Sequence, residues 1–234
     1  MTDVGISHIQ HPLSNIHIMR SKKVPEKTIT RLSIYLRCLE ELEADGVTTV
    51  SSRRLAERFG LNPAQVRKDL AYFGQFGVRG LGYCIAELKH NLERILGLKQ
   101  EWEVALVGLG NLGSALFNYR GFREKGFKIT AVFDKDPIKV GKKVRGILIH
   151  DVSRLVSIVK RRKIKIAILA IPASEAQAVV DRLVEAGVTA ILNFAPTQLS
   201  VPRAVKLQNV DISALLKTLT FYTVRGDRKA LKKA

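Results

Sequence analysis

A glycine-spaced turn after an apolar segment limits most strongly what this chain can fold into. Residues 102–107 form a short apolar run, which leads directly into Gly108-Leu109-Gly110-Asn111-Leu112-Gly113. An apolar run bounded by glycine is typical of a buried parallel strand. We expect Gly108 to allow a tight turn and Gly110 to let the backbone approach a pyrophosphate. Gly113 would let the next helix pack close to the strand.

A second apolar segment, residues 128–133, ends at Asp134. Asp134 lies about 20 residues past the last glycine, as the dinucleotide-binding fingerprint requires. A carboxylate there would accept both ribose hydroxyls of an adenosine and repel a 2′-phosphate. The N-terminus of the intervening helix would hold an anion through its free N–H groups and its dipole. A glycine turn with no ligand is the competing interpretation, but the order of strand, turn, helix, strand and Asp134 favours a dinucleotide site.

The length of 234 residues is enough for two small domains, and 46% hydrophobic residues support packed cores. No apolar run approaches the length of a membrane span, and the polar N-terminus lacks the apolar region of a signal peptide. Cys38 and Cys84 are far apart and form no C-x-x-C motif. We therefore expect reduced thiols, no metal site, no membrane contact and a cytoplasmic protein.

The formal net charge of +18 favours a polyanionic partner, with nucleic acid ahead of a membrane. The excess is not concentrated in the N-terminal half, because residues 1–100 carry 15 Lys and Arg against 10 Asp and Glu. Most of the surplus lies in residues 135–165 and in the C-terminal tail. Charge alone is therefore a weak guide to where such a partner binds.

Strands alternate with helical patterns over the second half of the chain, which predicts a parallel sheet with its ligand crevice at the carboxyl ends of the strands. The predicted fold is α/β, with an N-terminal winged helix-turn-helix and a C-terminal Rossmann-like sheet. We expect a disordered tail over residues 1–24, a DNA-binding domain over 25–85, a linker helix over 86–100, a dinucleotide-binding domain over 101–210 and a C-terminal helix with a basic tail over 211–234.

Two short helical patterns, residues 53–59 and 64–72, flank a glycine-containing turn and predict a helix-turn-helix. Ser51 or Ser52 would cap the first helix, and we expect both to contact DNA there. Pro63 would open the second helix. The second helix would turn its valine and leucine inward and leave the expected DNA contacts outward or flanking: Gln65, Arg67, Lys68 and Tyr72. Gln and Arg read base edges, whereas Lys mostly meets phosphate.

The glycine-rich segment 73–83 follows the second helix and predicts a wing with Arg79 at its tip, where an arginine suits a narrow minor groove. The competing interpretation of residues 25–85 is a small helical protein-binding domain whose basic residues are merely solvated.

Several motifs together, in this order, resemble the Rex family of bacterial redox-sensing transcriptional repressors. They are Arg67-Lys68-Asp69-Leu70-Ala71-Tyr72-Phe73-Gly74, the glycine-rich wing, Gly108-Leu109-Gly110-Asn111-Leu112-Gly113, Phe133-Asp134-Lys135-Asp136-Pro137, Ile191-Leu192-Asn193-Phe194-Ala195-Pro196 and Val210-Asp211. The resemblance covers the chain from about Pro25 to Tyr222. It implies a homodimer that binds operator DNA and leaves it when NADH replaces NAD+. A two-fold dimer would cover an inverted repeat in double-stranded DNA.

The resemblance also implies a C-terminal helix that is exchanged between protomers. The apolar side chains of this helix, which we expect to face inward, are Ile212, Leu215, Leu216, Leu219 and Tyr222. By the same resemblance, Tyr119, Phe194 and Asp211 would lie near the nicotinamide, and Arg31 would pair with Asp211 in one of the two states. Arg31, Tyr119 and Asp211 would thus form the switch. The remaining expected cofactor contacts are Leu109, Asn111, Leu112, Lys135 and Pro172.

Two other functions stay open. An NAD-dependent dehydrogenase would need a general acid or base beside the nicotinamide. His150 is the only histidine of residues 101–210, and its neighbour Asp151 would point away from it. A winged-helix regulator of another nucleotide, such as coenzyme A, would use the same glycine turn. We favour the repressor and expect no catalytic residue.

Overall fold

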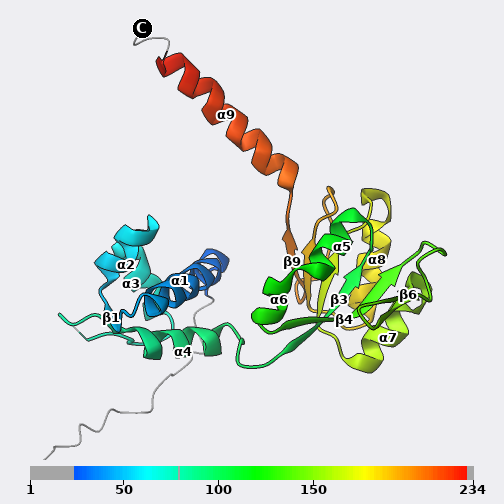
Figure 1. Cartoon of the computed structure of the whole chain (residues 1–234), viewed down its shortest axis with the longest axis horizontal. Helices are drawn as coiled ribbons and strands as arrows, with labels where there is room; N and C mark the ends of the chain where they lie inside the picture. The colour runs from blue at the N-terminus through cyan, green and yellow to red at the C-terminus, as the bar shows by residue number, and fades with distance from the viewer. Residues whose placement is uncertain (1–23, 79, 231–234) are drawn as a thin grey trace, which may run out of the picture. The chain divides into compact units, whose positions relative to one another are not determined.

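The computed structural model describes residues 24–78 and 80–230, with side chains to residue 224. The chain divides into two compact units, with the boundary between Lys99 and Gln100 (Figure 1). Each unit has a hydrophobic core of its own. Apart from Val24, the predicted N-terminal tail lies outside the described residues.

Four helices form the part of the N-terminal unit that the structure describes. They are α1 (Glu26–Ala44), α2 (Ser52–Phe59), α3 (Pro63–Ala71) and α4 (Ile85–Ile95). Their inward faces share one core, which includes Leu32, Tyr35, Leu39, Leu55, Val66, Leu70, Leu88 and Leu92. The starts of α2 and α3 follow from local chemistry, because the side chains of Ser51 and Asn62 accept hydrogen bonds from backbone N–H groups of the first turns.

The segment that we expected to be a wing is only partly a hairpin. A single bridge joins Val78 to Gly82, and the regular pairing is between β1 (Thr49–Val50) and β2 (Tyr83–Cys84), which are antiparallel. The segment therefore closes onto the strand that precedes α2. Gly82 permits this contact, since a Cβ on it would lie 2.6 Å from a carbonyl oxygen of β1. The predicted wing-tip residue, Arg79, lies outside the described residues.

A seven-stranded sheet in the order β5-β6-β4-β3-β7-β8-β9 forms the centre of the C-terminal unit. Its strands are β3 (Trp102–Val107), β4 (Phe127–Asp134), β5 (Lys143–Val144), β6 (Ile147–Asp151), β7 (Ile166–Leu169), β8 (Ala190–Asn193) and β9 (Lys206–Asn209). All pairings are parallel except that of β5 with β6. This arrangement confirms the predicted α/β class. The strand order reverses at β3, and such a switch point is where open α/β sheets bind ligands.

Helices cover both faces of the sheet. The short 3-10 helix η1 (Val152–Arg154), α7 (Leu155–Arg162) and α8 (Ala173–Glu185) pack on one face, around Ala105, Val107 and Phe133. The other face, which includes Val104 and Leu106, packs against side chains of α5 (Asn111–Asn118) and α6 (Arg120–Glu124). Figure 1 shows α7 and α8 on the side of the sheet away from α5 and α6. Both faces of β3 are therefore buried, as its continuous apolar run requires.

The last helix, α9 (Ile212–Ala230), corrects one expectation. Its apolar side chains do not face inward within one chain: Ile212, Leu215, Leu216, Leu219 and Tyr222 are 52–65% exposed. The spacing of apolar residues correctly predicted an apolar face on α9, but no other part of the described chain covers that face. Among residues 24–78 and 80–230, no helix is long and apolar enough to cross a membrane.

Candidate dinucleotide and nucleic-acid sites

The glycine turn after β3 is shaped by close backbone contacts. Gly108 has φ +93°, in the left-handed region, and its N–H donates a 2.8 Å hydrogen bond to the carbonyl oxygen of Phe133 on β4. A Cβ on Gly108 would lie 2.3 Å from Ala170 O. At Gly113, a Cβ would lie 1.9 Å from Gly108 O, so only glycine lets α5 approach the turn this closely. Gly108 and Gly113 are therefore required by the fold itself.

Gly110 is different, because nothing in the fold requires it to be glycine. Its φ of −74° suits any residue, and a Cβ there would have no heavy atom within 4 Å. Gly110 is the N-cap of α5 and provides no side chain to cap the first N–H groups of that helix. The turn thus leaves open space against bare backbone at a helix N-terminus. This arrangement fits the pyrophosphate of a dinucleotide.

Asp134, at the end of β4, holds the turn in place. Its Oδ2 accepts a 2.7 Å hydrogen bond from Leu109 N, and its Oδ1 accepts one of 2.9 Å from Asp136 N. Lys139 Nζ lies 3.6 Å from the same carboxylate. Burial acts to raise the pKa of Asp134, but the two backbone N–H groups and Lys139 outweigh it and lower the pKa. The carboxylate is therefore ionised beside the turn, where a ribose would lie.

A cavity of about 210 Å³ opens at this carboxyl end of β3. Of the expected cofactor contacts, it is lined by Gly108, Gly110, Asp134, Lys135 and Pro172. Lys135 forms an ion pair with Glu175, which also lines this cavity. Leu109 is buried under the turn, whereas Asn111 and Leu112 are exposed on the first turn of α5.

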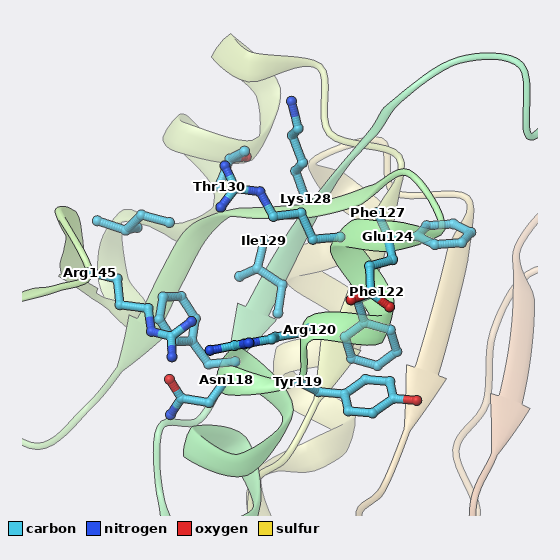
Figure 2. Close-up of a pocket in the computed structure, with 13 residues that line it drawn as sticks. Asn118, Tyr119, Arg120, Phe122, Glu124, Phe127, Lys128, Ile129, Thr130 and Arg145 are labelled. Atoms are coloured by element: carbon cyan, nitrogen blue, oxygen red, sulfur yellow. The ribbon is translucent and has the colours of Figure 1, made fainter.

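The residues expected at the nicotinamide end do not line this cavity. Tyr119, between α5 and α6, is 60% exposed and packs edge-on against Phe122 with 5.1 Å between ring centroids. Both rings line a separate cavity of about 560 Å³, and Figure 2 shows them on one side of it with Arg145 on the other. Phe194 follows β8 and packs on the α5 face of the sheet. Asp211 Oδ1 accepts hydrogen bonds from Ser213 Oγ and Ala214 N, so it caps α9.

In the N-terminal unit, Arg67 and Lys68 are exposed on α3. Arg67 Nη1 donates a 2.9 Å hydrogen bond to Ser52 Oγ at the start of α2. Ser51, Ser52 and Arg67 line one cavity of about 600 Å³ beside the glycine-rich segment. Tyr72 is half-buried against the core. The structure therefore brings together three of the predicted DNA contacts, and it leaves Lys68 exposed beside them.

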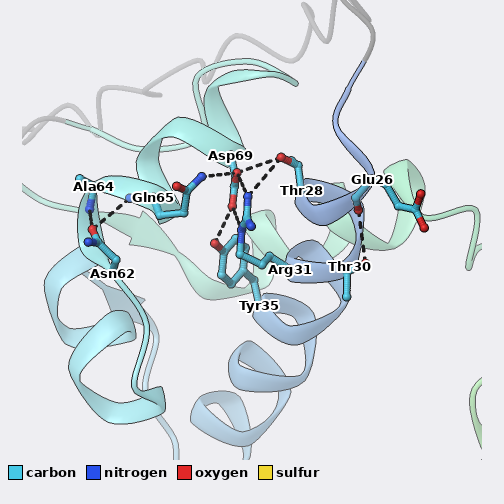
Figure 3. A network of polar contacts seen from close by, with 9 residues as sticks. All are labelled: Glu26, Thr28, Thr30, Arg31, Tyr35, Asn62, Ala64, Gln65 and Asp69. Carbon is cyan, nitrogen blue, oxygen red and sulfur yellow. Dashed lines mark hydrogen bonds and ion pairs between the residues drawn. The ribbon is translucent and has the colours of Figure 1, made fainter. Parts of the chain in front are cut away.

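Sequence reasoning missed a buried carboxylate on the inward face of α3. Asp69 is fully buried, and its two oxygens accept hydrogen bonds from Thr28, Arg31 and Tyr35 of α1 and from Gln65 of α3 (Figure 3). Burial acts to raise the pKa of Asp69, but these hydrogen bonds outweigh it and lower the pKa to about 2. The one available signal was position, since Asp69 falls on the inward face of α3 between Val66 and Leu70.

His150 shows little of what a general acid or base would need. Burial first, and then nearby arginines, lower its pKa, and its ring packs beside that of Phe133 at 5.9 Å between centroids. Asp151 does not orient it, because Asp151 Oδ1 accepts a hydrogen bond from Ser153 N. Among the residues that the structure describes, no group of three or more His, Cys, Asp or Glu side chains is arranged to hold a metal ion.

Two protein-family profiles match the chain. One, described as a putative DNA-binding protein N-terminus, covers residues 23–71, and the other, described as a CoA binding domain, covers residues 99–197. A curated relative from Desulfitobacterium hafniense, named redox-sensing transcriptional repressor Rex, is 51% identical over 212 residues. These residues make up 91% of this chain and 100% of the relative.

Two solved structures of RSP, a Rex-family repressor, are also similar. The complex with β-NAD+ and operator DNA is 42% identical with a TM-score of 0.84, and it covers 91% of this chain and 99% of that one. The complex with β-NADH is 40% identical with a TM-score of 0.80, over the same shares of the two chains.

Proposed function

The chain belongs to the Rex family of redox-sensing transcriptional repressors, and on that premise we propose that it binds operator DNA through α3 and NAD+ or NADH at the carboxyl end of β3. The observation that carries the cofactor assignment is Gly110. The fold would accept a side chain at this position, yet the residue is glycine and faces open space at a helix N-terminus. NADH in place of NAD+ would release the DNA.

The dinucleotide would bind in the cavity beneath the glycine turn. The backbone of Gly110 would face the pyrophosphate, and the first N–H groups of α5 would donate to its oxygens. Asn111 and Leu112, exposed in that first turn, would flank it. Asp134 would accept the ribose hydroxyls with the lone pairs that Leu109 N and Asp136 N leave free.

Asp134 would also set the preference for NADH over NADPH, because its charge repels a 2′-phosphate. Lys139 lies 3.6 Å from this carboxylate, and Lys135 lines the same cavity. Both cations weaken the local negative potential. We therefore expect the preference for NADH to be clear but moderate.

On the DNA side, Arg67 is proposed to read a base edge in the major groove and Lys68 to contact phosphate. Ser51 and Ser52, which line one cavity at the N-terminus of α2, would donate to a phosphate beside it. Tyr72 and Arg79 complete the expected contact set.

A homodimer with exchanged α9 helices would account for the exposed apolar face of that helix. Beyond the five side chains named above, Phe221 and Val224 are also more than half exposed, and a lone helix with such a surface is not stable in water. A second copy that covers this face would create two equivalent DNA-reading units. We propose that they cover an inverted repeat with half-sites about one helical turn, or a multiple of it, apart.

The switch must detect the nicotinamide ring. When bound, the dinucleotide supplies a ring that carries a positive charge in its oxidised form and none in its reduced form. We propose that Asp211 is attracted to the oxidised ring and that Phe194 packs beside it. The hydroxyl of Tyr119 has no hydrogen-bond partner among the described residues, so it is available to hold one position of the switch.

The cation proposed to pair with Asp211 is Arg31 on α1. Arg31 is already bound to Asp69, with Nε and Nη2 donating at 2.5 and 2.8 Å, and must leave it to reach Asp211. Arg37, on the same helix, is 71% exposed and has only a loose pair with Glu41 at 3.9 Å. Arg37→Ala is therefore the matched comparison for Arg31→Ala. If only Arg37→Ala removes the response to NADH, Arg31 is not the switch cation.

Specific observations bear on the two alternative functions, a dehydrogenase and a regulator that senses coenzyme A. The curated relatives are named as repressors and not as enzymes, which sets a dehydrogenase aside. One observation favours coenzyme A as the ligand, since the profile over residues 99–197 is described as a CoA binding domain. Asp134 opposes it, because the adenosine ribose of coenzyme A carries a 3′-phosphate beside which a carboxylate is unfavourable. A repressor of this kind would act in the cytoplasm, where it meets both DNA and the NAD+ pool.

The test is a titration of the full chain with fluorescent operator-like DNA, repeated with NAD+, NADH, NADPH and coenzyme A. We expect tight binding with NAD+, release at moderately lower concentrations of NADH than of NADPH, and no effect of coenzyme A. Release by coenzyme A but not by NADH would overturn the cofactor assignment. Sequence-independent binding under all conditions would overturn the operator assignment.

A further inference from the structure

The buried Asp69 cluster offers more than stability, because one of its members reaches the DNA-reading side of α3. Asp69 Oδ1 accepts hydrogen bonds from Thr28 Oγ1 at 3.1 Å, from Arg31 Nη2 at 2.8 Å and from Gln65 Nε2 at 2.8 Å. Oδ2 accepts from Arg31 Nε at 2.5 Å and from Tyr35 Oη at 2.7 Å. A carboxylate offers about four lone-pair sites, so this one is saturated.

This contact fixes which way the Gln65 amide points. An ionised carboxylate only accepts hydrogen bonds, so the NH₂ group of Gln65 must face Asp69, and its carbonyl oxygen must point away. Figure 3 shows the amide nitrogen directed at Asp69. If the amide turned over, two acceptor oxygens would meet in a buried cluster, which is unfavourable. Among the described residues, no donor occupies the Gln65 carbonyl oxygen.

Gln65 also has the right position on α3. It is the third helical residue, and Asn62 Oδ1 holds its backbone N–H at 3.2 Å. It is half-buried at the flank between the inward face, with Val66 and Leu70, and the exposed face with Lys68. Side chains near the N-terminus of a recognition helix are those that reach base edges.

We propose that Asp69 is a specificity-positioning residue, which makes Gln65 present its carbonyl oxygen to the major groove and so selects a base that offers an amino group there. This inference rests on the proposed function, in which α3 lies in that groove. Adenine N6 and cytosine N4 are the major-groove donors, whereas guanine and thymine present acceptor oxygens. A free glutamine reads its bases in either amide orientation, but this one is held in a single orientation.

The experiment selects operators from a pool with randomised half-sites, with the full chain and NAD+, and then sequences them. Gln65→Ala is expected to flatten the base preference at one position of each half-site. In the wild type, that position should favour adenine or cytosine over guanine or thymine by about tenfold or more. Asp69→Asn, which frees the amide to turn, should reduce the preference at the same position to within about threefold and leave the other positions unchanged.

Tyr35→Phe is the matched control, because it removes a hydrogen bond to Oδ2 and leaves the bond between Oδ1 and Gln65. It should lower the urea midpoint of unfolding and leave every base preference unchanged. A full wild-type preference in Asp69→Asn would overturn the role of Asp69. If this variant does not fold, Gln65→Ala still tests the amide orientation, through the identity of the base favoured at the position that it flattens. The inference is overturned if Gln65→Ala changes no position, if the changed position favours guanine or thymine in the wild type, or if Tyr35→Phe flattens that position. A wild-type protein that selects no inverted repeat instead overturns the proposed function.

Discussion

The glycine turn separates what the fold needs from what the ligand needs, and two substitutions test that separation. In Gly113→Ala, the new Cβ would lie 1.9 Å from Gly108 O, where ordinary contacts are 3.4–4 Å. The helix α5 must move by about 1.5 Å, and overpacking of this kind costs about 1–3 kcal/mol of unfolding free energy. In Gly110→Ala, no atom lies within 4 Å and φ is −74°. That change should stabilise the ligand-free protein by about 0.4–1 kcal/mol, because it restricts the unfolded chain.

The assay measures unfolding and binding separately. Urea unfolding of the ligand-free protein, followed by circular dichroism, gives the unfolding free energy, and a titration followed by NADH fluorescence gives the dissociation constant. Gly110→Ala should unfold at or above the wild-type urea midpoint and bind NADH about tenfold to a hundredfold more weakly, since its methyl group meets the pyrophosphate. Gly110→Val should not bind NADH detectably.

The reasoning is refuted by either of two results. NADH binding to Gly110→Val with wild-type affinity would show that the pyrophosphate does not lie against this backbone. A wild-type urea midpoint for Gly113→Ala would show that α5 does not need its close approach to the turn. Gly110→Ala serves as the internal control, because it adds the same methyl group three residues earlier, at a position with no heavy atom within 4 Å.

Four further expectations concern single side chains. Asp134→Ala should weaken NADH binding and narrow the preference over NADPH, and equal wild-type affinities for the two would contradict the role of Asp134. Arg67→Ala should reduce operator binding more than non-specific binding, whereas Lys68→Ala should mainly flatten the salt dependence of the affinity; unchanged affinity in both would refute the placement of α3. Asp211→Ala should bind NADH but respond little to the NADH/NAD+ ratio in DNA binding, and normal release would leave Asp211 as a helix cap. The pKa of Asp69 is about 2 in the folded protein and about 3.9 in the unfolded chain, so the ionised carboxylate stabilises the fold above about pH 4. This contribution to the unfolding free energy is lost as the pH falls towards about 2. The unfolding free energy of Asp69→Asn, measured over the same pH range, should lack that loss.

The glycine turn and the carboxylate beside it could be predicted because each of their signals is local. Gly108 and Gly113 are glycine for steric reasons that act within a few residues, and Asp134 ends the next strand of the same unit. The parallel sheet followed from apolar runs buried on both faces. The edge strand β9 was missed, because only Leu207 among its four residues is even half-buried and no apolar run marks it. The five-residue helix α6 was too short for any periodicity to appear.

The Asp69 cluster was missed for a different reason. In the sequence, Asp69 follows two cations and resembles a surface residue that pairs locally with them. Its actual partners on α1, Thr28, Arg31 and Tyr35, precede it by 34–41 residues, and only tertiary packing brings them together. The pattern of α9 likewise predicted an apolar face but could not show what covers it, since periodicity describes one helix and not its neighbour.

The hydrogen bond between Leu109 N and Asp134 has a consequence for what such a sensor can measure. The carboxylate holds the glycine turn without help from any ligand, so the binding surface for the adenosine half is already formed. NAD+ and NADH share this half, and neither has to order the turn when it binds. They then compete for one binding site, and only the contacts of the nicotinamide ring distinguish them. Once the total pool exceeds both dissociation constants, every site is filled, and the fraction filled by NADH depends on the proportion of the two forms. The protein would then respond to the composition of the pool and be indifferent to its size.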